Sequence, residues 1–177
     1  MVSDARATPR CIFVYNQSIL SQLSRPTPSL EVSNRMRLVK RRHTAVERKL
    51  AYALRRAGVS FSTHGSVCGC TPDIVFGRER VVVFVDGDFW HGRILVEQGE
   101  NALARSFKPS VRKFWVAKIV RNAERDSRQV RILRRNGWAV VRLWEKDVLR
   151  DVNLAVSTVG RRLWQRRTKL KLPIDGV

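Results

Sequence analysis

The sequence predicts an α/β layer fold, in which helices flank a mixed central β-sheet. Residues 81–85 are continuously apolar, which is typical of a strand in the middle of a sheet that is covered on both faces. Segments with helical periodicity lie before and after this strand, so helices and strands alternate along the chain. A length of 177 residues and an apolar fraction of 44% are enough for one domain with a substantial core.

The first half of the chain predicts one helix and three short strands. Thr44 is a good helix N-cap, Glu47 completes a capping box with it, and Gly58 ends the helix. The apolar positions of this helix follow one face and are Val46, Leu50, Ala53, Leu54 and Ala57. Strands are expected over 59–62, 73–76 and 80–86, and a tight turn at 77–79 joins the last two.

The second half predicts two helices separated by a strand. Residues 91–110 are expected to form a loop, because Gly92, Gly99 and Pro109 interrupt them. A long basic helix follows over about 111–135, and Asn136 and Gly137 end it. Its apolar side is formed by Trp115, Ile119, Ala123, Val130 and Leu133. A buried strand over 138–144 and an amphipathic helix from about Asp151, which uses Leu154, Val159 and Leu163, complete the order.

The expected domain organisation is simple. Residues 1–31 mix Ser, Pro and Gln with little periodicity, as a flexible N-terminal arm does. Residues 32–170 form a single domain, and residues 171–177 form a tail. The segment 33–42, which ends with Arg41 and Arg42, is dense in Arg and Lys and is expected to be a first helical turn or a phosphate-contacting lead-in.

The strongest bulk feature is a formal net charge of +20, from 35 Lys and Arg against 15 Asp and Glu. Such a charge repels itself unless a polyanion screens it, so nucleic acid is the expected partner. The alternative is a basic surface that serves solubility alone. No run of about 18 apolar residues occurs, so no membrane span is expected.

The three cysteines indicate a reducing, cytosolic compartment. Their number is odd, and Cys68 and Cys70 are too close in sequence for an ordinary disulfide loop. No second Cys or His pair follows them at zinc-binding spacing, so we expect no structural zinc at this pair.

Acidic residues and one histidine surround the end of the apolar strand. If strands 73–76 and 80–86 pair as a hairpin, Asp73 lies beside the Val85–Asp86 peptide, and Asp88 and His91 follow closely. Hydrolysis of a phosphodiester needs a metal to activate water and to neutralise the phosphate, and oxygen ligands suit Mg²⁺. The side chain of Asp73 and the backbone carbonyl of Val85 could hold such an ion.

These segments resemble the very short patch repair (Vsr) endonucleases, within the PD-(D/E)xK nuclease superfamily. The resemblance covers about two thirds of the chain, in family order, through Ser33-Asn34-Arg35-Met36, Thr44-Ala45-Val46-Glu47, Asp73, residues 83–92, residues 114–119, Asn122, Arg125-Asp126, Gly137-Trp138 and Trp144-Glu145. It implies a Vsr-like, restriction-endonuclease-like fold. It also implies a DNA endonuclease that depends on Mg²⁺, for which Mn²⁺ can substitute, and that acts on double-stranded DNA. The enzyme is expected to be a monomer or a DNA-dependent dimer. Its expected location is the bacterial cytoplasm, at the nucleoid.

The resemblance also assigns roles to single residues. Asp73 is expected to be the main metal-binding carboxylate, and the carbonyl of Val85 a second ligand. His91 is expected to be the active-site histidine, because histidine moves protons near neutral pH. Asp86 would hold a water of the metal, and Glu47 would be an active-site glutamate. Each has a simpler alternative: a capping residue for Glu47, a turn residue for Asp86 or Asp73, and a structural residue for His91.

Aromatic and basic residues beside this site are expected to bind DNA. In the family, aromatics at the positions of Phe89, Trp90 and Trp115 wedge into the base stack, which rewards bent or mismatched DNA. The alternative is core packing, above all for Trp115. The expected DNA-binding set is Phe89, Trp90, Trp115, Lys118, Arg41 and Arg42.

The chain departs from the family at a structural zinc that Cys and His commonly build near this motif. Asp88 stands where a Cys is common, and Lys146 follows Glu145 where another ligand could sit. Arg93 and the residues after it offer no Cys or His, so we expect no zinc of the family type and a 93–109 segment held by other means.

Three functions remain open on the sequence. The first is strand nicking beside T:G mismatches in very short patch repair. The second is restriction-type cleavage of specific or modified duplex DNA, and the third is a non-catalytic DNA-binding relative.

Overall fold

The computed structural model describes residues 44–173, so the arm expected over 1–31, the basic pair Arg41 and Arg42 and the end of the tail lie outside the described residues. The helices and strands are α2 (Ala45–Arg56), β1 (Ser62–Thr63), β2 (Ile74–Phe76), β3 (Val81–Asp86), α3 (Arg93–Gln98), α4 (Glu100–Arg105), α5 (Pro109–Arg135), β4 (Ala139–Trp144), α6 (Glu145–Arg150) and α7 (Val152–Leu170). None of these helices is long and apolar enough to cross a membrane.

A mixed sheet forms the centre of the described region. Its strand order is β1-β2-β3-β4; β2 is antiparallel to both β1 and β3, and β3 is parallel to β4. β3 is therefore an interior strand, as its continuous apolar run predicts, and its residues are buried except for a half-buried Val85. The expected fold class, a mixed sheet flanked by helices, is confirmed.

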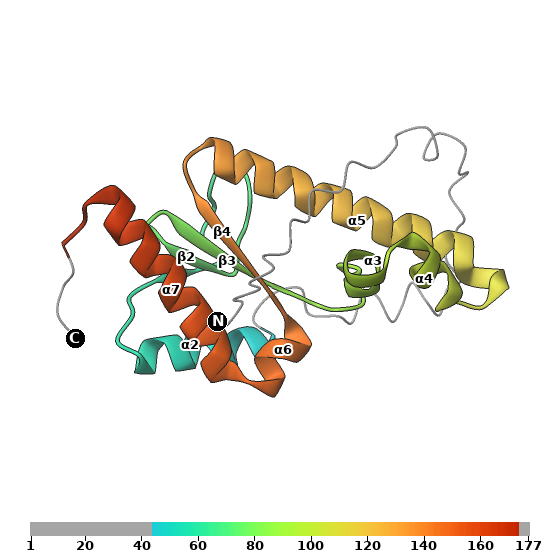
Figure 1. Cartoon of the computed structure of the whole chain (residues 1–177), viewed down its shortest axis with the longest axis horizontal. Coiled ribbons are helices and arrows are strands. Elements are labelled where there is room, and N and C mark those ends of the chain that lie inside the picture. The colour runs from blue at the N-terminus through green and yellow to red at the C-terminus, as the bar shows by residue number, and fades with distance from the viewer. Residues whose placement is uncertain (1–43, 174–177) are drawn as a thin grey trace, which may run out of the picture.

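Helices cover both faces of the sheet (Figure 1). On one face α2, α6 and α7 pack on β2, β3 and β4 in a core that contains Leu50, Phe76 and Val159. On the other face the C-terminal part of α5 packs through Leu133. The N-terminal half of α5 extends past the sheet, where α3 and α4 pack beneath it (Figure 1).

The helix expected after Thr44 has the predicted start and end. The hydroxyl of Thr44 accepts a hydrogen bond from the backbone N–H of Glu47 at 3.2 Å. Val46, Leu50 and Leu54 are buried. Gly58 has φ of 72°, the left-handed conformation that glycine adopts after a helix.

Several expected elements were wrong in detail. The loop expected over 91–110 instead contains α3 and α4, because Gly92, with φ of 69°, is the N-cap of α3, and Gly99, with φ of 85°, joins α3 to α4. Leu95 and Leu103 from these helices are buried against α5, which stabilises both. The short helix α6 was not expected, and Leu154 is 53% exposed instead of part of the core.

The first strand is shifted from the expected 59–62 to Ser62–Thr63. Val59 and Phe61 pack against the core instead of pairing with β2.

Candidate active site

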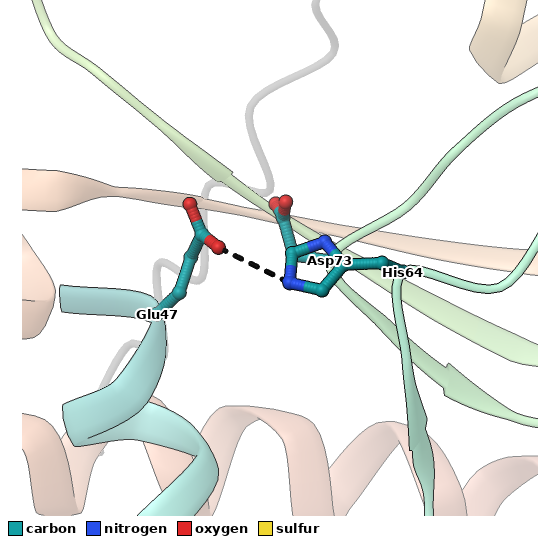
Figure 2. A group of neighbouring side chains, drawn as sticks. All are labelled: Glu47, His64 and Asp73. Atoms are coloured by element: carbon teal, nitrogen blue, oxygen red, sulfur yellow. Dashed lines mark ion pairs between the residues drawn. The ribbon is translucent and has the colours of Figure 1, made fainter. Parts of the chain in front are cut away.

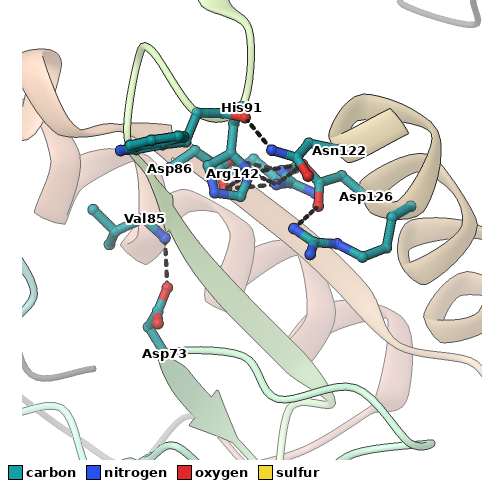
Figure 3. A network of polar contacts seen from close by, with 9 residues as sticks. Asp73, Val85, Asp86, His91, Asn122, Asp126 and Arg142 are labelled. Carbon is teal, nitrogen blue, oxygen red and sulfur yellow. Dashed lines mark hydrogen bonds and ion pairs between the residues drawn. The ribbon is translucent and has the colours of Figure 1, made fainter. Parts of the chain in front are cut away.

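Asp73 lies at the start of β2 and faces the end of β3. Its backbone N–H donates to the carbonyl of Val83 at 3.0 Å, and its own carbonyl accepts from the backbone N–H of His64 at 3.1 Å. Its side-chain Oδ2 accepts from the backbone N–H of Val85 at 2.7 Å (Figure 3). The hairpin therefore places Asp73 beside Val85, as the sequence predicts.

The Asp73 carboxylate is in an environment that disfavours its charge. Burial raises its pKa from an ordinary 3.8 to about 6. The Val85 N–H and His91 act to lower the pKa, whereas the charges of Glu47 and Asp86 act to raise it. A bound cation would stabilise the ionised form of this carboxylate, so the electrostatics suit a metal ligand.

Glu47 and His64 join Asp73 in one cluster. Glu47 is only 8% exposed and projects from the first turn of α2, while His64 follows β1. The His64 Nε2 and Glu47 Oε2 atoms are 3.5 Å apart (Figure 2). One ligand atom from each of Glu47, His64 and Asp73 lies within 4.8 Å of the others. Glu47 thus both lies in the first turn after the N-cap and reaches a potential metal site, so the geometry is compatible with both of its expected roles.

His91 lies on the other side of the end of β3. Its backbone N–H donates to the carbonyl of Gly87 at 3.1 Å, which fixes the turn that carries it. Its ring Nδ1 is 2.6 Å from Oδ2 of Asp126 on α5 and 3.4 Å from Oδ1 of Asp86. Because a carboxylate can only accept, Nδ1 carries a proton and the opposite nitrogen, Nε2, is left for proton transfer.

Arg142 links the two carboxylates that surround His91 (Figure 3). Its Nε and Nη2 contact the two oxygens of Asp86, each at 2.5 Å, and Nη2 is 3.2 Å from Oδ2 of Asp126. Both oxygens of Asp86, which was expected to hold a water of the metal, are therefore bound by this guanidinium. Asp86 and Asp126 are 4% and 6% exposed, so the arginine neutralises charge that is almost out of reach of water.

The same contacts set the protonation of this group. Burial acts to raise the pKa of Asp126, but the hydrogen bond from His91 and the charge of Arg142 outweigh it and hold that pKa below its ordinary value. Burial acts to lower the pKa of Arg142, but Asp86 and Asp126 raise it overall. Asp126 therefore stays ionised and Arg142 stays charged.

Sequence reasoning missed His64 and Arg142 and gave Asp126 no role. A lone arginine in the otherwise apolar strand 139–144 was a signal for Arg142, since buried arginines need partners. His64 had no comparable signal, because its neighbours Glu47 and Asp73 come together only in the fold.

Comparison with known proteins places the chain in a family. The family model described as DNA mismatch endonuclease Vsr matches residues 28–96. The Type II nicking enzyme V.NmeDIP of Neisseria meningitidis serogroup C is 37% identical over 121 residues, which is 68% of this chain and 77% of that protein. The chain belongs to the Vsr endonuclease family. The expected resemblance and the nuclease class that it implies are thereby confirmed.

Other relatives in the family agree. The Type II nicking enzyme V.HpaIIP of Haemophilus parainfluenzae is 30% identical over 127 residues, covering 72% of this chain and 86% of that protein. The DNA mismatch endonuclease Vsr of Escherichia coli (strain K12) is 36% identical over 115 residues, which cover 64% of this chain and 68% of that protein.

The aromatic residues that the Vsr resemblance singles out lie in one cluster. The ring centroid of Phe89 is 5.0 Å from that of Trp90 and 5.1 Å from that of Trp115. Nζ of Lys118 lies 5.3 Å from the Trp90 ring and 5.6 Å from the Trp115 ring. Phe89 is 44% exposed, so the cluster presents an aromatic surface with a cation beside it.

Arg93 holds the segment where the Vsr family commonly has zinc. Its Nη1 is 3.0 Å from Oδ1 of Asp88 and 3.1 Å from Oδ1 of Asp147, and its Nε is 2.7 Å from Oε1 of Glu97. Asp88 also accepts from the backbone N–H of Lys146 at 3.1 Å. This ion-pair network joins the turn after β3 to α3 and α6.

Proposed function

We propose that this chain is a Mg²⁺-dependent DNA endonuclease that nicks one strand of duplex DNA beside a T:G mismatch. The observation that carries the proposal is the arrangement at the end of β3. A cluster of potential metal ligands around Asp73 lies on one side of the Val85–Asp86 peptide, and the His91 group lies on the other (Figure 3).

The residues around Asp73 fit a divalent metal. Asp73 is a half-buried carboxylate whose ionised form is disfavoured by burial, and Glu47 brings a second carboxylate within reach. In a β-strand the N–H and C=O of one residue point to the same side, so the Val85 carbonyl also faces Asp73. A bound Mg²⁺, or Mn²⁺ in its place, would activate water and neutralise charge on the phosphate.

His91 is the proposed proton-transfer residue. Asp126 accepts from its Nδ1, which fixes the ring orientation and leaves Nε2 to take or return a proton. Arg142 holds Asp126 and Asp86 in place, so we propose that Asp86 acts by positioning this group, with both of its oxygens already bound.

The aromatic cluster is the proposed contact with bases. Phe89 is the exposed member, and it is supported by Trp90 from the turn after β3 and by Trp115 from α5. Insertion of such a ring costs base stacking, and a mismatched step costs less to open than a paired one. Lys118 would contact phosphate beside the rings, and the +20 net charge would supply general affinity for the backbone.

Cleavage assays test the proposal. The protein is incubated with Mg²⁺ and either a T:G duplex or the matched duplex, and separately with supercoiled plasmid. Single-strand nicks confined to the T:G duplex support the proposal. Linear products from paired or modified DNA would instead indicate restriction-type cleavage, and cleavage by the Asp73→Ala variant at the parent rate would refute the metal assignment.

Salt dependence tests the DNA partner separately. Because Lys and Arg release counterions from phosphates, the affinity for duplex DNA should fall steeply between low and physiological salt. A flat response would exclude phosphate contacts as the source of binding.

A further inference from the structure

The position of His64 is the feature that the proposed function leaves unexplained. The imidazole follows β1 and its side chain is only 12% exposed. Its backbone N–H donates to the carbonyl of Asp73 at 3.1 Å, so the two residues are held side by side. The ring points toward the carboxylate of Glu47, and one of its nitrogens lies within 4.8 Å of a carboxylate oxygen of Asp73 (Figure 2).

The three side chains come from separate elements but have the spacing of ligands. Glu47 comes from α2, His64 from the end of β1 and Asp73 from the start of β2. In an octahedral site with bonds of about 2.1 Å, neighbouring ligand atoms are about 3.0 Å apart and opposite ones about 4.2 Å. The distance between His64 Nε2 and Glu47 Oε2 is 3.5 Å, and no two of the three ligand atoms are more than 4.8 Å apart. These separations are close to the octahedral range, so small side-chain rotations bring the three atoms onto one ion.

We propose that His64 is a nitrogen ligand of the metal at Asp73, so that the site, which takes Mg²⁺ through its carboxylates, gains affinity for transition-metal ions such as Mn²⁺ and Co²⁺ from the imidazole. This proposal rests on the metal site of the proposed function. Carboxylate and carbonyl oxygens suit Mg²⁺, whereas imidazole nitrogen favours ions later in the first transition row. A site with His64 therefore binds Mn²⁺ and Co²⁺ more tightly than a site of oxygens alone.

The competing interpretation is a simple ion pair. A protonated His64 would pair with Glu47 at 3.5 Å, and the two would support the fold without touching a metal. The two interpretations differ in one measurable respect, because only a ligand places a histidine nitrogen on the ion.

Metal binding without DNA separates them. Titration calorimetry measures the affinity of the tag-free full chain for Mn²⁺ and Mg²⁺, in a buffer without nitrogen ligands. In the His64→Gln variant we expect the affinity for Mn²⁺ to fall by about 10- to 100-fold, and the affinity for Mg²⁺ to change much less. Equal affinity for Mn²⁺ in the parent and the variant overturns the proposal.

The matched control is His91→Gln, which removes the other histidine of the described region. Because His91 pairs with Asp126 on the far side of β3, this variant should keep the parent affinity for Mn²⁺. A loss in His91→Gln that equals the loss in His64→Gln would overturn the specific role of His64.

A spectroscopic measurement on the parent protein does not depend on how the variants fold. Pulsed electron paramagnetic resonance of bound Mn²⁺ should show coupling to a histidine nitrogen, which changes when the protein is labelled with ¹⁵N-histidine. Absence of that coupling overturns the proposal even if His64→Gln is unfolded.

An Asp73→Asn variant distinguishes the two proposals. If it loses Mn²⁺ binding while His64→Gln retains it, the metal site of the proposed function stands and the role of His64 fails. If Asp73→Asn also retains the metal, the metal site itself fails.

Discussion

The Asp73→Asn substitution should stabilise the metal-free protein while it abolishes cleavage. In the folded chain the pKa of Asp73 is about 6, against an ordinary 3.8, so ionising this carboxylate costs more in the folded state than in the unfolded state. Asparagine keeps a carbonyl oxygen that can accept the hydrogen bond from the Val85 N–H, but it carries no charge.

The magnitude follows from the two pKa values. The interval between 3.8 and about 6 corresponds to about 3 kcal/mol at 1.36 kcal/mol for each pH unit. Solvent screens part of this carboxylate, so about 1–3 kcal/mol of added stability is expected for the variant near pH 7.5. For a chain of 177 residues, each kcal/mol raises Tm by about 2–4 °C.

The sign of the pH dependence is opposite to that of a carboxylate in a favourable ion pair. Below about pH 4 Asp73 is protonated in both states, and the destabilisation is absent. Between about pH 4 and pH 6 the unfolded chain loses the proton first, so the parent loses stability as pH rises, and above pH 6 the loss is complete. The advantage of Asp73→Asn should therefore be large at pH 7.5 and small at pH 4.5.

Urea unfolding in EDTA at these two pH values measures the effect. Glu124→Gln is the matched control, since it removes one carboxylate charge from α5, far from β3 in sequence, and accounts for the general effect of raising an already high net charge. If Asp73→Asn is no more stable than the parent at pH 7.5, or if its advantage is the same at pH 4.5, the electrostatic reasoning is refuted.

Three further predictions follow from the other contacts of the site. Arg142→Met leaves Asp86 and Asp126 buried without their cation, which should lower the free energy of unfolding by about 3–5 kcal/mol. Arg142→Lys should recover part of this stability. In steady-state nicking assays Arg142→Lys should have a lower kcat than the parent and the same KM for DNA. Combined Phe89→Ala and Trp90→Ala substitution should reduce T:G cleavage far more than general DNA affinity in parallel cleavage and gel-shift assays, and equal losses would exclude a wedge. Arg93→Ala should lower stability by about 1 kcal/mol at low salt and less at 1 M KCl, because its ion pairs are partly exposed; a thermal melt at both salt concentrations checks this.

Local signals predicted most of the fold correctly. The N-cap at Thr44 and the glycine at 58 delimited α2, and the continuous apolar run placed β3 inside the sheet. The same local reasoning treated Gly92 and Gly99 as signs of a loop. In the structure Gly92 begins α3 and Gly99 joins α3 to α4, and the leucines of both helices are buried against α5, so tertiary packing overrides the local signal.

The candidate site could be predicted from the sequence only where one short segment carries it. Asp73, Val85 and His91 lie within a few residues of the apolar strand, and both their spacing and the family resemblance pointed to them. The partners of these residues come from distant parts of the chain: Asp126 is 35 positions from His91, and Arg142 is 56 positions from Asp86. Neither pairing has a periodicity that a sequence can show.

The end of β3 explains why the two halves of the site keep a fixed relation. Val85 donates its N–H to Asp73 on the side of the proposed metal site, and the next residue, Asp86, is held through both carboxylate oxygens by Arg142 on the His91 side. The parallel ladder from Val81 to Asp86 fixes this peptide against β4, which also carries Arg142. A shift of the peptide would move the proposed metal ligands and the His91 group together, so their separation is set by one strand and not by flexible loops. A strand of this kind supplies the preorganisation that hydrolysis at a phosphate requires.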